Sequence, residues 1–261
     1  MIKAAVLGSP IAHSLSPKIH RRAYEFLGIA GSYDAIEVGE YELANFFESE
    51  RSLEWSGFSL TMPLKEAVIK LNCEVSQIAK LCNSGNTLYR RESQWSVTST
   101  DYLAFRNLVN LKGGEKVAVI GGGGTARAAI GALNEKVATV DVFLRNPKRQ
   151  SALVAAAPDL QLKFLEMSTQ LSGYDLIIQT TPAGAIDELL VTELEVTGKL
   201  LECLYKPWPT KFAERYLDAQ LEVISGGQLL VEQAMFQVEL FAHVKVDFEA
   251  MRPLLLAEIT E

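Results

Sequence analysis

The chain has 261 residues, which is enough for about two domains of ordinary size. Hydrophobic residues make up 48% of it and charged residues 22%, a balance typical of globular proteins. The 25 Lys and Arg residues against 32 Asp and Glu give a net charge of −7. This acidic balance, with no basic run, argues against a nucleic-acid-binding surface but is compatible with a small anionic ligand bound in a local basic pocket.

No apolar run reaches the roughly 18 to 20 residues of a membrane-spanning helix. The apolar stretch 1–7 is too short for the core of a signal peptide and is better interpreted as a first buried strand. The three cysteines, Cys73, Cys82 and Cys203, lack metal-ligand spacing, and Cys203 is expected to be a buried free thiol. We therefore expect a reduced, cytoplasmic protein without a metal site.

Short apolar runs alternate with helical patterns along the first hundred residues, which favours an α/β fold. The residue pattern predicts strands at 2–7, 33–38 and 57–60, helices at 17–28, 41–51 and 101–110, and a hairpin of 87–90 with 95–98. Residues 64–83 also carry helical spacing. The polar turn at 112–114 is consistent with the entrance to a second domain.

Beyond this turn the pattern becomes that of a parallel sheet with both faces covered. Residues 116–120 form a near-continuous apolar run, which is typical of a strand buried on both sides. Further strands are expected at 139–144, 174–179, 199–204 and 221–225, with helices between them. Two long helical patterns, 228–241 and 248–259, close the chain.

A glycine-rich turn follows the buried strand and opens a helix. The spacing Gly121-x-Gly123-x-x-Ala126 is that of a dinucleotide-binding turn. The first glycine permits the tight turn, the second lets the backbone approach a pyrophosphate, and the small third residue lets the helix pack closely. Free N–H groups at the helix N-terminus attract phosphate. Such turns are common, but the strand–turn–helix context favours a nucleotide site here.

The next strand leads into a basic turn that contains Arg145, Lys148 and Arg149. An NAD site places an Asp or Glu at this position to bind the ribose 2′-hydroxyl. Guanidinium groups instead bind a 2′-phosphate through charged hydrogen bonds. The turn therefore favours NADP over NAD, the alternative being a solvated basic turn.

Several polar side chains lie at the expected ends of elements, where each has an ordinary structural interpretation. Ser14 and Ser16 precede a helix, where Ser16 could be an N-cap or the two hydroxyls could hold a carboxylate. Lys65 follows a strand and a proline turn, and a lone lysine is usually solvated. Further candidates with ordinary readings as turn, cap or half-exposed helical residues are Asn86, Asp101 and Gln233.

Taken together, these segments resemble the shikimate dehydrogenase family over nearly the whole chain and in the right order. The matching segments are Gly8-x-Pro10-x-x-His13-Ser14-x-Ser16-Pro17, Thr61-x-Pro63-x-Lys65, Gly85-Asn86-Thr87-Leu88, Thr100-Asp101, the glycine turn with Ala126-Arg127-Ala128, Tyr205-x-Pro207-x-x-Thr210 and residues 226–234. Each motif alone is weak, whereas the ordered set is specific.

The resemblance implies a substrate-binding and catalytic α/β domain formed by 1–101 and 228–261, and a Rossmann NADP-binding domain with a parallel sheet at 102–227. It implies reversible reduction of 3-dehydroshikimate to shikimate, a step toward chorismate and the aromatic amino acids. Lys65 and Asp101 are the implied catalytic pair. The implied substrate contacts are Ser14 and Ser16 to the carboxylate, Thr61, Asn86 and Gln233 to the ring hydroxyls, and Tyr205. The expected cofactor contacts are Gly121, Gly123, Gly124, Thr125, Ala126, Arg145, Lys148, Arg149, Thr180 and Gly226.

The chemistry agrees with this assignment. Hydride transfer to a ketone leaves an alkoxide, to which the Lys65 ammonium can donate a proton while stabilising the charge. A free lysine has a pKa of about 10.4, too high for a good base at neutral pH. Asp101 is therefore best described as orienting the ammonium or as forming a coupled pair with it.

The chain departs from the family pattern at a few positions. Ser59, Ser99 and Leu144 stand where Asn is usual, and Glu202 stands where Asp is usual. The two serines form fewer hydrogen bonds than Asn, which affects the expected substrate pocket. A paralogue acting on quinate or a related ring hydroxy acid is one alternative, although the presence of both Ser14 and Ser16 favours shikimate. A non-catalytic NADP-binding regulator is another, although both Lys65 and Asp101 are present. We expect a monomer or a homodimer.

Overall fold

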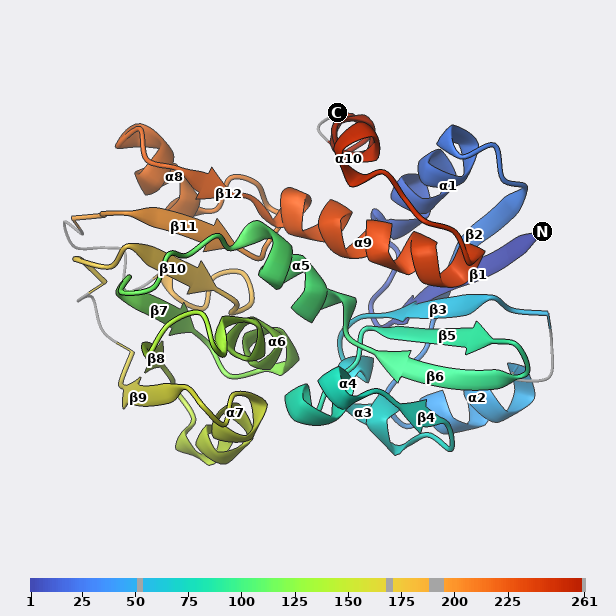
Figure 1. Cartoon of the computed structure of the whole chain (residues 1–261), viewed down its shortest axis with the longest axis horizontal. Coiled ribbons are helices and arrows are strands. Elements are labelled where there is room, and N and C mark those ends of the chain that lie inside the picture. Colours follow the sequence, from blue (N-terminus) through green and yellow to red (C-terminus); the bar gives the residue numbers. More distant parts are fainter. Residues whose placement is uncertain (51–53, 168–170, 188–194, 260–261) are drawn as a thin grey trace. The chain divides into compact units, whose positions relative to one another are not determined.

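The computed structural model describes residues 1–50, 54–167, 171–187 and 195–259. The chain forms two compact units, each built on its own six-stranded sheet (Figure 1). Unit 1 consists of Met1–Ala104 and Leu230–Glu261, and unit 2 consists of Phe105–Leu229. Two helices, α5 (Thr100–Leu108) and α9 (Gly226–Ala242), contain the boundaries between the units.

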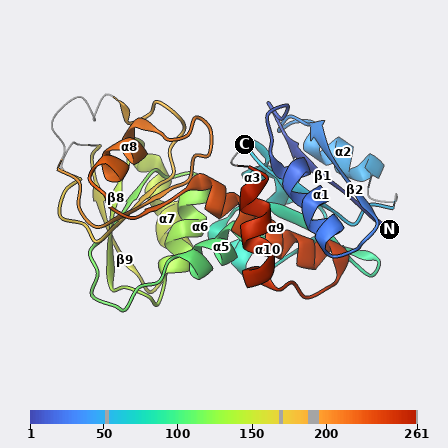
Figure 2. The ribbon, with the colours of Figure 1, turned by 90° about the horizontal axis from the view of Figure 1, so that it is seen from above.

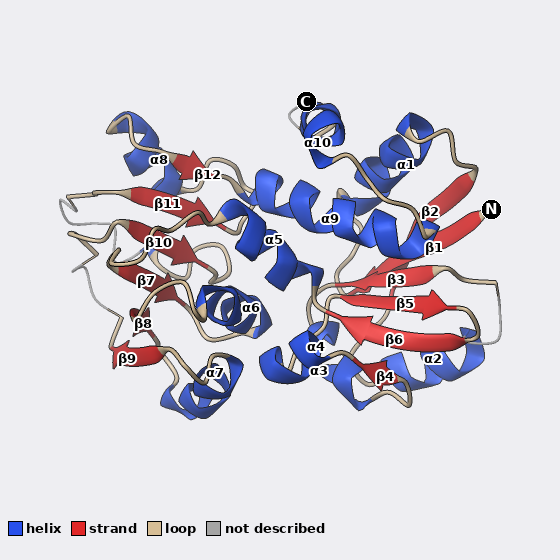
Figure 3. Cartoon of the chain, in the orientation of Figure 1, coloured by secondary structure: helices blue, strands red, loops and turns tan. Residues whose placement is uncertain are grey.

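The sheet of unit 1 is mixed, with strand order β2-β1-β3-β5-β6-β4. Strand β1 pairs in parallel with β2 and β3, whereas β5 is antiparallel to both β3 and β6 (Figure 3). The strands are β1 (Ile2–Gly8), β2 (Gly31–Glu37), β3 (Gly57–Leu60), β4 (Glu74–Val75), β5 (Thr87–Arg91) and β6 (Gln94–Thr98). The expected hairpin of β5 and β6 is confirmed.

Helices cover both faces of this sheet, and the alternating side chains of β1 contribute to the hydrophobic core on each face. Ala4 and Val6 pack with helices α1 (Ser16–Phe26), α9 and α10 (Phe248–Ala257), which lie together in Figure 2. Ala5 and Leu7 point to the opposite face, toward α2 (Leu43–Glu50) and residues 64–79. Because side chains alternate along a strand, one buried strand can contribute to two hydrophobic cores.

Unit 2 contains a fully parallel sheet with strand order β12-β11-β10-β7-β8-β9. This is the order of a Rossmann fold, and the chain direction reverses between β7 and β10, where such folds bind ligands. The strands are β7 (Val117–Ile120), β8 (Thr139–Phe143), β9 (Gln161–Leu165), β10 (Leu176–Gln179), β11 (Lys199–Glu202) and β12 (Val223–Ile224); the helices are α6 (Gly124–Leu133), α7 (Gln150–Ala156) and α8 (Lys211–Asp218). The expected α/β class with a parallel second sheet is confirmed.

The prediction of helix throughout 64–83, made from the spacing of apolar residues, is wrong. The segment divides into α3 (Leu64–Ala67), a 3₁₀ helix (Val68–Lys70), β4 and α4 (Gln77–Cys82). Ser76 caps α4 by accepting a hydrogen bond from the N–H of Ala79, and Asn83 ends it in the left-handed conformation. Local caps and the edge pairing of β4 with β6 outweigh the helical spacing.

Smaller differences concern element ends and one thiol. Helix α2 starts two residues later than expected, and Arg51, the last residue of that prediction, lies outside the described residues. Strand β9 was not among the expected strands because it is a half-exposed edge strand without a clear apolar run. Cys203 is only partly buried, since it follows the last residue of β11, so the prediction of a buried thiol is wrong. Within the described residues, no helix combines the length and apolar character needed to span a membrane.

Candidate active site

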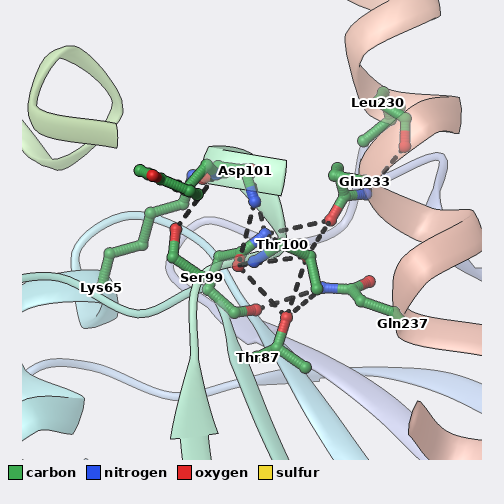
Figure 4. Close-up of polar contacts among 10 residues, drawn as sticks. Lys65, Thr87, Ser99, Thr100, Asp101, Leu230, Gln233 and Gln237 are labelled. Atoms are coloured by element: carbon green, nitrogen blue, oxygen red, sulfur yellow. Dashed lines mark hydrogen bonds and ion pairs between the residues drawn. The ribbon is translucent and has the colours of Figure 1, made fainter. Parts of the chain in front are cut away.

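A lysine–aspartate ion pair lies at one side of a polar cluster in unit 1 (Figure 4). Lys65 comes from the first turn of α3, just after β3, and Asp101 comes from the first turn of α5, just after β6. The distance from Lys65 Nζ to Asp101 Oδ2 is 2.6 Å. The side chains are 22% and 11% exposed, so the pair is mostly shielded from solvent.

The side-chain amide of Asn86 holds this pair from the other side. Its Nδ2 donates to Asp101 Oδ1 at 2.9 Å and to Thr100 Oγ1 at 2.9 Å. Its Oδ1 accepts from the backbone N–H of Thr100 at 2.7 Å. Because the two ends of the amide meet a backbone donor and a carboxylate, the orientation of the amide is determined by the network. Asp101 is thus bound by Lys65 on one oxygen and by Asn86 on the other.

Gln233 joins the cluster from α9, 147 residues away from Asn86 in the sequence. Its Oε1 accepts from Asn86 Nδ2 at 3.1 Å, and its Nε2 donates to the carbonyl of Leu230 at 2.7 Å. The side chain is 6% exposed, so the interpretation as a half-exposed helical residue is wrong. Packing of α9 against the sheet of unit 1 encloses it.

The other expected substrate residues of unit 1 follow the carboxyl ends of neighbouring parallel strands. Ser16 is the first residue of α1, with Leu15 at the N-cap, so the N-cap interpretation of Ser16 is wrong. Ser14 Oγ accepts from the N–H of Ser16 at 3.3 Å. Thr61 follows β3 and lies against β1, because a Cβ on Gly8 would be 2.4 Å from Thr61 Cγ2. Ligands of open α/β sheets bind at such strand ends.

The glycine turn of unit 2 has the geometry that its residues require. Gly121 has a φ of +117° and donates its N–H to the carbonyl of Phe143 at 3.0 Å. A Cβ at this position would lie 2.4 Å from Thr180 Oγ1, which itself donates to the carbonyl of Ile120 at 2.7 Å. Gly123 is the N-cap of α6, and a Cβ there would meet no atom within 4 Å. Gly124, Thr125 and Ala126 form the first turn of α6.

The basic turn after β8 lies against this glycine turn. Arg145, Lys148 and Arg149 are exposed, and Arg149 Nη1 donates to the carbonyl of Gly122 at 3.3 Å. Asn146 orders the turn by accepting from the N–H of Lys148 at 3.1 Å. Three cations beside a partly exposed helix N-terminus match a ligand with several phosphates, including a 2′-phosphate. The residues present therefore fit NADP.

A buried carboxylate holds the loop that carries Tyr205. Glu202, at the end of β11, accepts from the N–H of Leu204 at 3.1 Å and from Thr210 Oγ1 at 2.9 Å. It is fully buried, and this desolvation raises the pKa of Glu202 to about 7. Gly226 packs on the same loop, since a Cβ there would be 2.3 Å from the carbonyl carbon of Leu204.

The structure therefore sorts the expected residues into two groups. Unit 1 brings Lys65, Asn86, Asp101 and Gln233 into direct contact, and unit 2 holds Tyr205 with the expected cofactor residues. The sequence interpretation missed Gln237, which is 1% exposed and bonded to Asn86 and Thr87. Its position one helical turn after Gln233 on α9 was the available signal. Among the described residues, no group of three or more His, Cys, Asp or Glu side chains could hold a metal ion.

The Rossmann order and the glycine turn of unit 2 place the chain in the class of α/β proteins with a dinucleotide-binding domain. Comparison with known proteins narrows this class. Residues 6–88 match the model of the shikimate dehydrogenase substrate binding domain. A protein of an Exiguobacterium species named shikimate dehydrogenase (NADP(+)) is 31% identical over 251 residues, covering 93% of this chain and 94% of that protein. The chain belongs to the shikimate dehydrogenase family.

Solved structures agree over the full length of the chain. The crystal structure of Mycobacterium tuberculosis shikimate dehydrogenase has a TM-score of 0.88 and 35% identity, covering 98% of this chain and 99% of that one. The Thermus thermophilus shikimate 5-dehydrogenase in complex with NADP(H) and shikimate has a TM-score of 0.84 and 28% identity, covering 99% of this chain and 100% of that one.

Proposed function

We propose that this protein is an NADP-dependent shikimate dehydrogenase, which reversibly reduces 3-dehydroshikimate to shikimate. The observation that carries the proposal is the Lys65–Asp101 ion pair, bound by Asn86, which in turn contacts Gln233, in a chain that belongs to this family. Relatives named shikimate dehydrogenase (NADP(+)), and a structural neighbour in complex with NADP(H) and shikimate, support both the cofactor and the substrate.

In the proposed reaction, bound NADPH supplies the hydride. Reduction of the ketone leaves an alkoxide oxygen, which takes a proton from Lys65 Nζ. The Lys65 ammonium also stabilises the negative charge as it develops. Asp101 orients the ammonium through its 2.6 Å contact and never needs to carry the proton itself. In the reverse direction the neutral amine of Lys65 accepts the hydroxyl proton of shikimate.

The substrate is assigned to unit 1 and the cofactor to unit 2. Ser14 and Ser16 bind the carboxylate, and Thr61, Asn86 and Gln233 bind the ring hydroxyls. Tyr205 is assigned as a further substrate contact by the family resemblance. Arg145, Lys148 and Arg149 bind the 2′-phosphate, with Gly121, Gly123, Gly124, Thr125, Ala126, Thr180 and Gly226 around the remaining cofactor. In this assignment the substrate-binding domain is 1–101 with 228–261, and the cofactor-binding domain is 102–227.

Two further assignments belong to the proposal. The three cysteines form no disulfide with one another, which is consistent with a cytoplasmic location. The protein is a monomer or a homodimer, which sedimentation velocity distinguishes directly.

The absorbance of the reduced nicotinamide tests the proposal when the protein is mixed with shikimate and NADP. We expect a rapid increase with this pair, a much slower one when NAD replaces NADP, and a slow one when quinate replaces shikimate. Faster turnover of quinate would assign the chain to a paralogue acting on a related ring hydroxy acid. No turnover of either acid, with NADP still binding, would assign it to the non-catalytic regulators.

A further inference from the structure

We propose that Gln237 is a positioning residue that holds Asn86, and through it the Asp101–Lys65 pair, in its reactive arrangement. Gln237 lies one turn beyond Gln233 on α9 and is 1% exposed. Its Nε2 donates to the backbone carbonyl of Asn86 at 3.2 Å and to Thr87 Oγ1 at 3.0 Å. The kinetic consequences of this role rest on the proposed function, whereas its effect on Lys65 does not.

The directions of the Gln237 hydrogen bonds to Ser59, Asn86 and Thr87 are determined by these neighbours. The Tyr33 hydroxyl donates to Ser59 Oγ at 2.5 Å, so the Ser59 proton is directed to Gln237 Oε1 at 2.7 Å. With its oxygen accepting, the Gln237 amide presents both N–H groups to Asn86 and Thr87. The amide therefore has one orientation, because the flipped one would face the Asn86 carbonyl with an oxygen.

A continuous chain of hydrogen bonds leads from Gln237 to the ion pair. Thr87 Oγ1 donates to Asn86 Oδ1 at 3.1 Å, Asn86 Nδ2 donates to Asp101 Oδ1 at 2.9 Å, and Asp101 Oδ2 contacts Lys65 at 2.6 Å. Thr87 and Tyr33 are fully buried, and Ser59 and Asn86 are 5% and 3% exposed. Buried hydrogen bonds of this kind are costly to break, because water cannot replace the lost partner. The relay, defined here as Tyr33, Ser59, Gln237, Thr87 and Asn86, therefore behaves as a rigid support.

The relay also gives Ser59 a structural role. Ser59 reaches Gln237 on one side, and Tyr33 from β2 completes its hydrogen bonding on the other. The His20 ring stacks on Tyr33, with ring centroids 3.9 Å apart, and holds it in place. Ser59 thus belongs to a support that ends at the Lys65–Asp101 pair.

The variant Gln237→Met removes three hydrogen bonds, to Ser59, Asn86 and Thr87, whereas Tyr33→Phe removes one, to Ser59. Both variants keep most of the side-chain volume. Because a shift of about 1 Å in a catalytic group costs about a hundred-fold, we expect Gln237→Met to lower kcat by roughly ten- to a hundred-fold. The KM for NADP should stay within about two-fold, since unit 2 is unchanged. Tyr33→Phe should lower kcat by a smaller factor. Tyr24→Phe is the matched control, because the Tyr24 hydroxyl is buried in the same core without a hydrogen-bond partner.

A double-mutant cycle separates positioning from general destabilisation. If Gln237 and Thr87 act through one relay, the combined Gln237→Met and Thr87→Val variant should lose little more kcat than the worse single variant. Additive losses, or an unchanged kcat in Gln237→Met, would overturn the proposal. If Gln237→Met does not fold, the same cycle with Tyr33→Phe and Thr87→Val decides the question by the same criterion.

A measurement on the protein without substrate keeps this proposal separate from the proposed function. The ¹⁵N resonance of the Lys65 ammonium, identified by its loss in Lys65→Arg, reports the environment of the ion pair. We expect this resonance to shift in Gln237→Met and Tyr33→Phe but not in Tyr24→Phe. An unmoved resonance in both relay variants would refute positioning by Gln237, even if the wild type oxidises shikimate. If the wild type does not oxidise shikimate, the proposed function fails, and the resonance still tests the relay.

Discussion

Asp101 binds Lys65 through one carboxylate oxygen, at 2.6 Å, and Asn86 through the other, at 2.9 Å. The lysine therefore has a defined position, although its side chain is long and could otherwise adopt many rotamers. A fixed ammonium is suited to donating a proton at one place, which is what reduction of a ring ketone requires.

Replacement of Lys65 tests this role. Lys65→Ala should lower kcat by roughly a hundred- to ten-thousand-fold, the usual cost of removing a group that transfers a proton. The KM for shikimate should change far less, because the expected substrate contacts are other side chains. Steady-state kinetics with saturating NADP measure both values. Lys70→Ala, a change to an exposed lysine in the same segment, is the control. Near-normal turnover in Lys65→Ala would exclude Lys65 as the proton donor.

The basic turn after β8 predicts cofactor preference. Joint replacement of Arg145 and Arg149 by Ala should raise the KM for NADP and leave the KM for NAD nearly unchanged, since only the 2′-phosphate distinguishes the two. Arg149 also contacts the glycine turn at Gly122, so the single Arg145→Ala variant is needed to separate recognition from local support. Equal losses with both cofactors would show that these arginines act on stability.

Two glycines of the same turn should respond in different ways to a methyl group. Gly121→Ala should destabilise the protein, because φ is +117° and the Cβ would be 2.4 Å from Thr180 Oγ1. A Cβ added at Gly123 would meet no other atom within 4 Å, so Gly123→Ala should unfold at about the wild-type temperature. We nevertheless expect it to bind NADP more weakly, because a methyl group would hinder the approach of the pyrophosphate. Thermal unfolding and NADP titration measure the two effects; unchanged NADP affinity in Gly123→Ala would contradict the assignment of the phosphate site.

Glu202 should make the stability of the protein depend on pH. Its pKa is raised by burial to about 7, so the folded state retains a proton that the unfolded chain loses near its ordinary pKa of 4.5. Stability contributed by this group is therefore present below pH 4.5 and is lost as the pH rises toward 7. The full loss is about 3 kcal/mol at 1.36 kcal/mol per pH unit.

The variant Glu202→Gln removes this titration and should gain stability relative to the wild type as the pH rises from 5 to 8. Urea unfolding at each pH measures the difference, and Glu214→Gln, at an exposed position on α8, is the control. A difference that does not change with pH would show that Glu202 is ionised throughout this range in the folded protein.

The sequence by itself determined the features that depend on short stretches of chain. The buried apolar run of β7 followed by glycines predicted the strand–turn–helix unit, because the turn conformation at Gly121 is one that few other residues adopt. Periodicity located most helices and strands to within a few residues. It failed at 64–83, where helical spacing continued through a segment that local caps and an edge pairing had divided. The resemblance to a family supplied the site residues, whose types and order are a property of the sequence.

Only the tertiary structure decided which side chains meet. Gln233 and Asn86 are 147 residues apart, and nothing local to either one indicates that their amides share a hydrogen bond. The relay likewise arises because α9 packs on the sheet of unit 1, which brings Gln237 to Ser59, 178 residues away in the sequence. The raised pKa of Glu202 depends on burial, which belongs to the folded chain. Sequence patterns record the preferences of neighbouring residues, whereas hydrogen-bond partners and desolvation depend on groups that folding brings together from distant segments.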